Sequence, residues 1–252
     1  MKRKVALITG ATSGIGTACA IRFAIGGYDL ILTGRNKERM EEVKEEAEKE
    51  GACVQTFIFD ISDLESVEKA TCQIFKTFDH IDVLINNAGL ARGLEAEYEG
   101  SIADWEEMID TNIKGLLYMT RLIVPHMVEQ NSGHIINIGS VAGDAAYAGG
   151  GVYCATKAAV KAISDGLRID LAHTNVRVTN VKPGLVETNF SNTRFHGDTS
   201  RAANVYKGIK PLSGDDIADV AFYAASAPAH VQIAEVLVLA THQANGTVIH
   251  RN

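Results

Sequence analysis

A strand, a glycine-rich loop and a helix at the start of the chain constrain its fold most strongly. Residues Val5–Thr9 are almost entirely apolar, which is the pattern of a strand buried on both faces of a parallel sheet. Glycines follow at positions 10, 14 and 16, and Gly14–Ile25 has the composition of a helix. Glycines let a backbone approach a pyrophosphate closely, and the amino end of a helix favours its negative charge. The segment therefore predicts the first unit of a dinucleotide-binding sheet.

Strand and helix patterns alternate along the rest of the chain. The predicted strands after the first are Leu30–Thr33, Cys53–Phe59, Val83–Ile85, His134–Ile138, Val176–Val181 and Glu235–Leu239. The predicted helices after the first are Asn36–Glu50, one beginning with a capping box at Ser62 and Glu65, Ile102–Gln130 with a possible kink at Pro125, Val152–His173 and Ser213–Ala225. This order predicts an α/β fold, a Rossmann-like doubly wound parallel sheet of about seven strands with helices on both faces.

No linker, repeat or change of composition divides the chain, so we expect residues 1–252 to form a single dinucleotide-binding and catalytic domain. Residues 183–212 have no strong period and are rich in glycine and polar residues. This stretch is interpreted as a segment that covers the substrate.

Ser140, Tyr153 and Lys157 form the most informative chemical pattern. Tyr153 and Lys157 are four residues apart in a predicted helix, so they share one face of it. Tyrosine ordinarily has a pKa near 10, and a neighbouring ammonium favours the phenolate and lowers that pKa. A tyrosine and a lysine at this spacing occur by chance in many helices. With the glycine loop, however, the pair is a plausible acid/base device.

The end of the second predicted strand indicates which dinucleotide binds. An NAD site normally has an acidic residue there, about 20 residues after the glycines, to bind the ribose hydroxyls. This chain has Thr33-Gly34-Arg35-Asn36 instead. The planar fork of Arg35 can pair with a 2′-phosphate, although a plain surface arginine is the alternative. The sequence therefore predicts NADP(H).

Bulk properties exclude several other classes of protein. The net charge of −7 argues against a nucleic-acid-binding surface. No apolar run is long enough to span a membrane, and the histidines lack metal-ligand spacing, so we expect neither a membrane segment nor a metal site. Four cysteines without a C-x-x-C pair and no visible signal peptide favour a reduced, cytoplasmic protein. Cys154 beside Tyr153 is interpreted as a packed thiol.

The chain has several motifs in the order typical of one family. They are the glycine loop, Asn86-Asn87-Ala88-Gly89, Asn112, Ser140, Tyr153, Lys157 and Pro183-Gly184. Along essentially its whole length the chain resembles the short-chain dehydrogenase/reductases. The resemblance implies the catalytic set Asn112, Ser140, Tyr153 and Lys157. It also implies that the cofactor contacts Gly10, Thr12, Ser13, Gly14, Ile15, Gly16, Arg35, Asp60, Ile61, Asn86, Ala88, Gly89, Tyr153, Lys157, Pro183, Gly184, Val186 and Thr188. In this family Asn112 helps to hold a water that links Lys157 to solvent.

Within this family, the segments 86–91, 104–112, 183–198, 228–230 and 245–251 resemble the NADP-dependent 3-hydroxy acid dehydrogenases. That group includes serine 3-dehydrogenase, L-allo-threonine dehydrogenase and malonic semialdehyde reductase activities. A 3-ketoacyl carrier-protein reductase is the first alternative, but it normally has a V-D-G-G-like turn after the last strand, which this chain lacks. A dinucleotide sensor without catalysis is a distant third. Arg92 departs from the group, in which a small apolar residue is expected.

A small 3-hydroxy acid or carbonyl substrate with a carboxylate needs a cation or several N–H donors. Arg194, in the covering segment, is the first candidate for that cation, and Arg251, in the tail, is the second. The family usually forms homotetramers through the helices that begin near Ile102 and Val152. Ala155, Ala159 and Ala162 on the second of these helices would allow close contact, so we expect a homotetramer.

Overall fold

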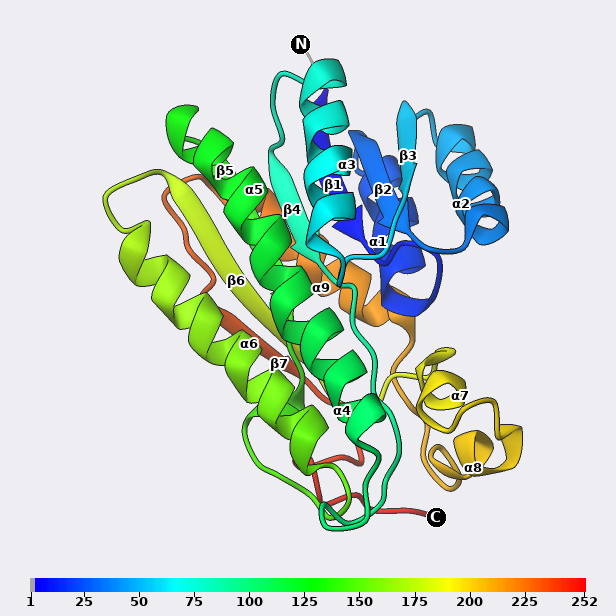
Figure 1. The fold of residues 1–252 in the computed structure, drawn as a ribbon. Helices are drawn as coiled ribbons and strands as arrows, with labels where there is room; N and C mark the ends of the chain where they lie inside the picture. Colours follow the sequence, from blue (N-terminus) through cyan, green and yellow to red (C-terminus); the bar gives the residue numbers. More distant parts are fainter. Residues whose placement is uncertain (1–2) are drawn as a thin grey trace.

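The computed structural model describes residues 3–252, and its centre is a sheet of seven parallel strands (Figure 1). The strands are β1 (Lys4–Thr9), β2 (Tyr28–Gly34), β3 (Val54–Ile58), β4 (Val83–Asn86), β5 (Gly133–Ile138), β6 (Val176–Pro183) and β7 (Glu235–Val238). Their order across the sheet is β3-β2-β1-β4-β5-β6-β7, and every neighbouring pair is parallel. The predicted fold class is confirmed.

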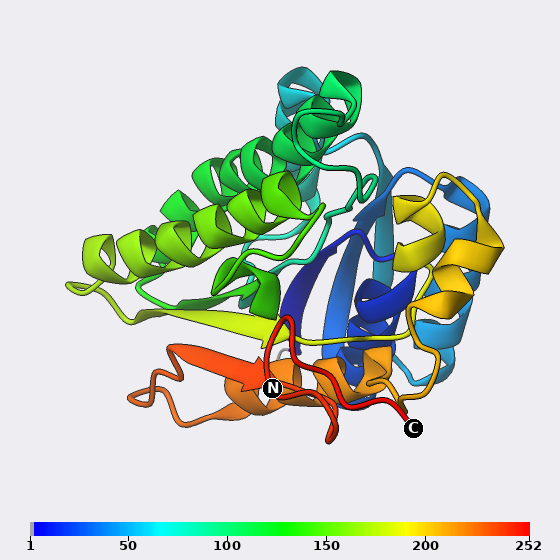
Figure 2. The same ribbon diagram turned by 90° about the horizontal axis from the view of Figure 1, so that it is seen from below.

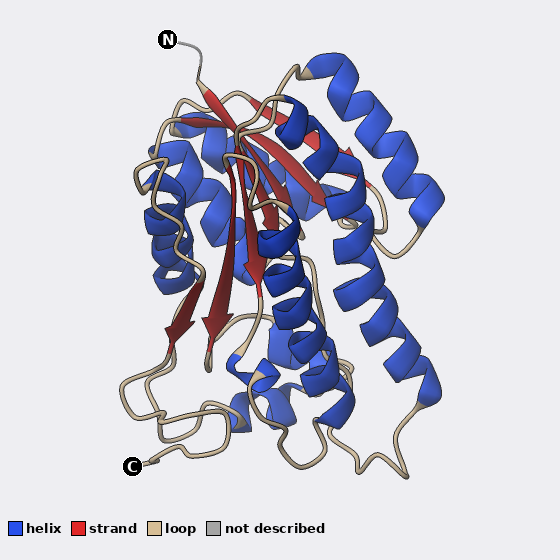
Figure 3. Ribbon diagram, turned by 90° about the vertical axis from the view of Figure 1, so that its left-hand side faces the viewer, coloured by secondary structure: helices blue, strands red, loops and turns tan. Residues whose placement is uncertain are grey.

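Helices cover both faces of this sheet (Figures 2 and 3). One face packs on α1 (Gly14–Ile25), α2 (Lys37–Lys49) and α9 (Gly214–Ser226), with Phe23 at the centre of the apolar cluster. The other face packs on α3 (Leu64–Thr77), α5 (Leu116–Glu129) and α6 (Gly151–Asp170), around Leu84 and Ile135. Since central strands such as β1 and β4 are buried from both sides, they have no exposed polar alternation.

Two local predictions are corrected by the structure. The N-cap of α3 is Asp63 rather than Ser62, because the Ser62 amide and hydroxyl both bond to the Asp60 carboxylate. The long helix begins with α4 (Ile102–Ile109) and continues into α5 through a π-helical segment, η1 (Asp110–Gly115). The irregularity therefore lies around Asn112. Pro125 lies inside α5, which has one uninterrupted range.

The stretch after β6 contains two short helices, α7 (Phe190–Arg194) and α8 (Thr199–Asn204). In Figure 1 they lie beyond the carboxyl ends of the strands, on the side of α1 and α2. The strand order reverses between β1 and β4, and such a reversal opens a crevice at the carboxyl edge of the sheet. The two short helices therefore stand over the edge where a ligand is expected.

Candidate active site

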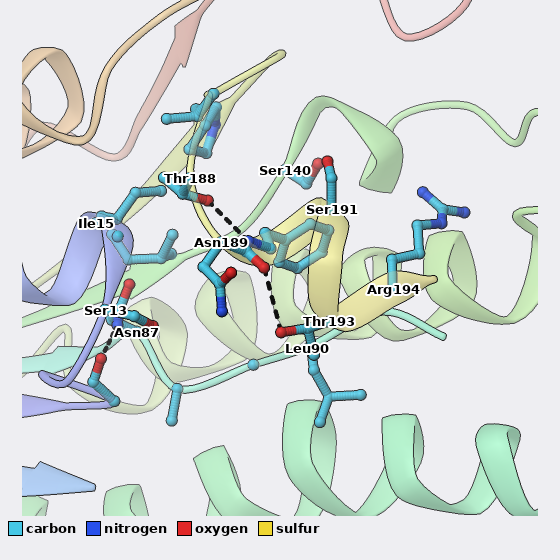
Figure 4. Close-up of a pocket in the computed structure, with 18 of the residues that line it drawn as sticks. Ser13, Ile15, Asn87, Leu90, Ser140, Thr188, Asn189, Ser191, Thr193 and Arg194 are labelled. Carbon is cyan, nitrogen blue, oxygen red and sulfur yellow. Dashed lines mark hydrogen bonds between the residues drawn. The ribbon is translucent and has the colours of Figure 1, made fainter. Parts of the chain in front are cut away.

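A cavity of about 570 Å³ lies at this carboxyl edge. Its walls come from the loops that follow β1, β2, β3, β4, β5 and β6, together with α7 and the tail. In the view of Figure 4, Ser13 and Ile15 of the glycine loop lie at one side and Arg194 of α7 lies at the opposite side. Segments far apart in the sequence thus share one chamber.

The glycine loop has room for backbone only. A Cβ atom at Gly10 would lie 2.8 Å from Ala88 Cα, and one at Gly16 would lie 2.2 Å from the Gly10 oxygen. Gly14 has a φ of 54°, in the left-handed region that favours glycine. The side-chain nitrogen of Asn87, Nδ2, donates to the carbonyls of Thr9 and Gly10 at 2.9 and 3.1 Å. This loop is held as a close backbone cradle at the start of α1, which fits a pyrophosphate.

Arg35 lies at the end of β2 on the cavity wall. Its Nη1 is 3.2 Å from Asp60 Oδ2, and 58% of its side chain is exposed. Burial would raise the pKa of the Asp60 carboxyl, but hydrogen bonds from Ser62 and the charge of Arg35 outweigh it and lower that pKa. The exposed guanidinium, held loosely at the cavity edge, is accessible to a phosphate.

Ser140, Tyr153 and Lys157 converge on the cavity from β5 and α6. Ser140 follows β5, where its hydroxyl accepts a bond from the Ala142 amide at 3.1 Å. Lys157 is buried and its Nζ donates to the Ile138 carbonyl at 2.8 Å. The ammonium nitrogen is 6.0 Å from the centre of the Tyr153 ring. Residues that the sequence separates by up to 17 positions are therefore neighbours here.

The protonation of the pair differs from the sequence-based expectation. Burial raises the pKa of Tyr153 above its ordinary value, although the Ser140 side chain opposes the rise. Burial also lowers the pKa of Lys157 to about 8. Desolvation is the largest cause of the shift for both groups, and the expected lowering of the pKa of Tyr153 is not found. A raised pKa favours the neutral phenol, which is the form that donates a proton when a carbonyl is reduced.

Asn112 lies in the π-helical segment and is buried beside the cavity rather than on its wall. Its amide oxygen accepts from Leu90 N at 2.8 Å, and its amide nitrogen donates to Leu90 O and Thr156 Oγ1 at 2.8 and 3.0 Å. The side chain thus ties the loop after β4 to the helix that carries Tyr153 and Lys157.

Arg194 lies on the cavity wall, close to Tyr153. Its Nε donates to the Gly93 carbonyl and its Nη1 to the Tyr147 hydroxyl, both at 2.9 Å. Its Cζ is 5.7 Å from the centre of the Tyr153 ring. Its Nη2 is buried and has no hydrogen-bond partner. A buried guanidinium nitrogen without an acceptor is costly, so this atom is a strong candidate for a ligand contact.

Most of the predicted cofactor and catalytic residues line the cavity, and four predicted residues do not. Those outside the lining are Gly16, Asn86, Asn112 and Arg251. Gly16 packs against the backbone of Gly10, and Asn112 bonds to the loop after β4, so both contact lining residues without lining the cavity themselves. Asn86 bonds inside the sheet to Asn137 at 2.9 Å. Arg251 Nη1 donates to the carbonyls of Val205 and Lys207 in the covering segment.

Sequence reasoning missed Tyr147, Asn87 and Gln243 as lining residues. Asn87 stands inside the Asn-Asn-Ala-Gly motif, which could have indicated it. Gln243 accepts from Leu185 N at 2.9 Å across 58 residues, and no local pattern predicts that contact. Cys154 is buried, as expected of a packed thiol.

Within residues 3–252, no three or more histidine, cysteine or acidic side chains gather as a metal-binding group. None of the helices described in this range is both long and apolar enough to cross a bilayer.

Comparisons with known proteins agree with this geometry. The family model described as short chain dehydrogenase matches residues 4–199. The NADP-dependent 3-hydroxy acid dehydrogenase of Salmonella typhi is 46% identical over 98% of this chain and 100% of its own. Sulfoacetaldehyde reductase 2 of Chromohalobacter salexigens is 43% identical over 95% of both chains. A closed form of serine dehydrogenase complexed with NADP+ has 44% identity and a TM-score of 0.92, covering 98% of this chain and 100% of that one. The chain belongs to the short-chain dehydrogenase family.

Proposed function

We propose that this chain is an NADP(H)-dependent dehydrogenase that transfers hydride between the nicotinamide and C3 of a small 3-hydroxy acid or its semialdehyde or keto form. The observation that carries the substrate class is the buried, unpartnered Nη2 of Arg194 in the cavity that contains Tyr153. A substrate carboxylate would give this nitrogen its acceptor. The names of two relatives, a 3-hydroxy acid dehydrogenase and a sulfoacetaldehyde reductase, each give a substrate that has both an anionic group and a hydroxyl or carbonyl group, which supports the same class.

NADP(H) fits the residues at the other end of the cavity. The glycine cradle has space for a pyrophosphate, and Arg35 stands where an NAD enzyme would have a carboxylate. Asp60 and Ile61 line the cavity and would contact the adenine. Pro183, Gly184, Val186 and Thr188 also line it and would contact the nicotinamide carboxamide. The NADP dependence of the relatives points to the same cofactor.

The chain itself supplies alignment and proton transfer. When bound, the nicotinamide cofactor would supply the hydride chemistry at the alcohol or carbonyl carbon. Ser140 holds the substrate oxygen, and Tyr153 removes its proton in oxidation or donates one in reduction. Lys157 holds the cofactor ribose and passes protons toward solvent, with Asn112 fixing the backbone around it. The segment 183–212 covers the substrate once it is bound.

Arg194 then orients the carboxylate while Tyr153 meets the hydroxyl. The guanidinium is fixed by Gly93 and Tyr147, so little side-chain freedom is lost when an anion binds. Arg251, whose guanidinium is engaged outside the cavity, remains a candidate only for the neighbouring site of an oligomer.

A spectrophotometric panel tests this function. We expect 3-hydroxy acids, including serine and L-allo-threonine, to reduce NADP+ with much higher kcat/KM than simple neutral alcohols, and NAD+ to be a poor substitute. A preference for long neutral 3-ketoacyl thioesters would favour the carrier-protein reductase alternative. Failure to oxidise or reduce any member of the panel would favour a sensor.

We further propose a cytoplasmic homotetramer. Ile102, Leu117 and Ile169 are exposed on α4, α5 and α6, and Ala155 is exposed on α6, which suits helix packing between subunits. Light scattering at micromolar concentration should return four times the chain mass of 27.1 kDa. A monomer mass would contradict the assembly.

A further inference from the structure

Arg92 joins two elements that cover the cavity. It lies in the loop after β4, and 17% of its side chain is exposed. Its Nε and Nη2 bond to the two carboxylate oxygens of Glu107 on α4, at 2.7 and 2.9 Å. Its Nη1 donates to the Thr193 carbonyl on α7 at 2.5 Å. One planar guanidinium thus spans α4 and α7, at a position where the resemblance to the 3-hydroxy acid dehydrogenases predicted a small apolar residue.

The second end of this bridge is next to Arg194. The Gly93 amide donates to the Arg194 carbonyl, and Arg194 Nε donates back to the Gly93 carbonyl, both at 2.9 Å. Residues 92 and 93 therefore hold the backbone on both sides of the Arg194 Cα atom and also its side chain. With Nη1 on Tyr147, these contacts leave only Nη2 of Arg194 without a partner.

The charge of Arg92 is balanced at its own site. Its bidentate partner Glu107 is partly buried, and the hydrogen bonds from Arg92 lower the pKa of that carboxyl. A guanidinium already paired with a carboxylate adds little positive potential for a substrate. Arg92 is therefore suited to fixing a position rather than to binding an anion, and all three of its bonding nitrogens are needed for that.

We infer that Arg92, held by Glu107, is a positioning residue that braces α7 and aims the free nitrogen of Arg194 at the substrate anion. The brace acts through Arg194 and rests on the proposed function of that residue. It gives α4, which carries no residue of the catalytic set, a part in substrate selectivity.

Arg92→Met tests the brace because it keeps much of the side-chain volume and removes every donor. In the full-length enzyme we expect KM for a 3-hydroxy acid to rise about tenfold, with kcat and the KM for a neutral alcohol within about twofold of wild type. Arg92→Lys should behave similarly, since one ammonium cannot fill three nitrogen positions. If Arg92→Lys restores the wild-type KM, charge rather than the fork matters and the brace is wrong.

Arg168→Met is a matched control. Arg168 has 16% of its side chain exposed, pairs with Asp165 and donates to the carbonyls of Val178 and Ala234, away from the cavity. Arg168→Met should change neither the KM for a 3-hydroxy acid nor the KM for a neutral alcohol. If this variant also raises the KM of charged substrates selectively, the effect of Arg92→Met is a general consequence of lost stability and the inference fails.

Amide exchange separates the brace from the proposed role of Arg194. In the substrate-free enzyme, Arg92→Met should speed exchange of the Gly93 amide about tenfold or more, and Arg168→Met should not. Unchanged exchange at Gly93 overturns the brace whatever the kinetics show.

The double variant tests whether the brace acts through Arg194. In an Arg194→Met background, Arg92→Met should raise the KM for a 3-hydroxy acid no further. If Arg194→Met alone has no charge selectivity while Gly93 exchange responds to Arg92, the substrate proposal fails and the brace on α7 stands.

Discussion

The two ends of the cavity are built differently. The cofactor end consists of short loops at strand ends, and its shape depends on missing side chains: a Cβ at Gly10 or Gly16 would collide with backbone. The substrate end is assembled from side chains that meet across long sequence separations, such as Arg194 with Tyr147, 47 residues apart. A backbone cradle suits a ligand common to many enzymes, whereas a side-chain assembly can change with the substrate.

Loss of the Tyr153 hydroxyl should have the largest effect, and it should affect only the substrate end. Tyr153→Phe keeps the ring, whose centre lies 5.7 Å from the centre of the Phe190 ring, but it cannot transfer a proton. We expect kcat to fall about 10²–10⁴-fold, the usual range for a lost general acid or base. Binding of NADPH, followed by fluorescence, should be unchanged. Turnover near that of wild type would remove Tyr153 from the mechanism.

At the cofactor end, Arg35→Ala should raise the KM for NADPH and leave that for NADH nearly unchanged. A charge-assisted bond to phosphate contributes about 1.5–3 kcal/mol, so the increase should be about 10- to 150-fold. Steady-state kinetics with both cofactors measure it. Equal weakening of the two would mean that Arg35 serves the pyrophosphate or the fold instead.

Titration of His134 should have a smaller effect, on the pH dependence of folding stability, and His134 lies at neither end of the cavity. It lies buried on β5, where its Nε2 contacts Thr179 Oγ1 at 2.8 Å while Thr179 donates to the Ile233 carbonyl. Its Nδ1 has no partner, and burial lowers the pKa of His134 to about 3. In the unfolded chain the imidazole of His134 takes up a proton below about pH 6.5, whereas in the folded chain it stays neutral until a much lower pH. Its contribution to stability is therefore complete above pH 6.5 and is lost as the pH falls toward 3, at up to about 1.4 kcal/mol per pH unit.

Denaturant unfolding at pH 7.5 and 5, at one protein concentration, checks this. His134→Gln should lose less stability between the two pH values than wild type does. Parallel losses would show that other groups account for the acid sensitivity. The variant also separates acid unfolding of the scaffold from the titration of the cavity residues.

The difference between the two ends also explains what the sequence could predict. Apolar strands and glycine spacing are local features, and they predicted the fold and the glycine loop. The helix predicted to begin at Ser213 is α9, and Ser213 is its N-cap. Asp63 replaced Ser62 as a cap because Asp60 competes for the serine, and the π segment at Asn112 has no local signal. The raised pKa of Tyr153 depends on burial, which only the assembled structure reveals. The contacts of Arg92 and Tyr147 with α7 are long-range in the same way.

The charge selectivity of Arg194→Met tests the central claim most directly. Methionine keeps an apolar stem and removes the unpartnered nitrogen, so kcat/KM for a 3-hydroxy acid should fall about 10- to 100-fold. Activity on a neutral alcohol or ketone should stay within about twofold. Arg201→Met, which alters another arginine of the covering segment that lies outside the cavity lining, should change neither. If charged and neutral substrates lose activity by the same factor, Arg194 does not bind the carboxylate and the proposed substrate class is contradicted.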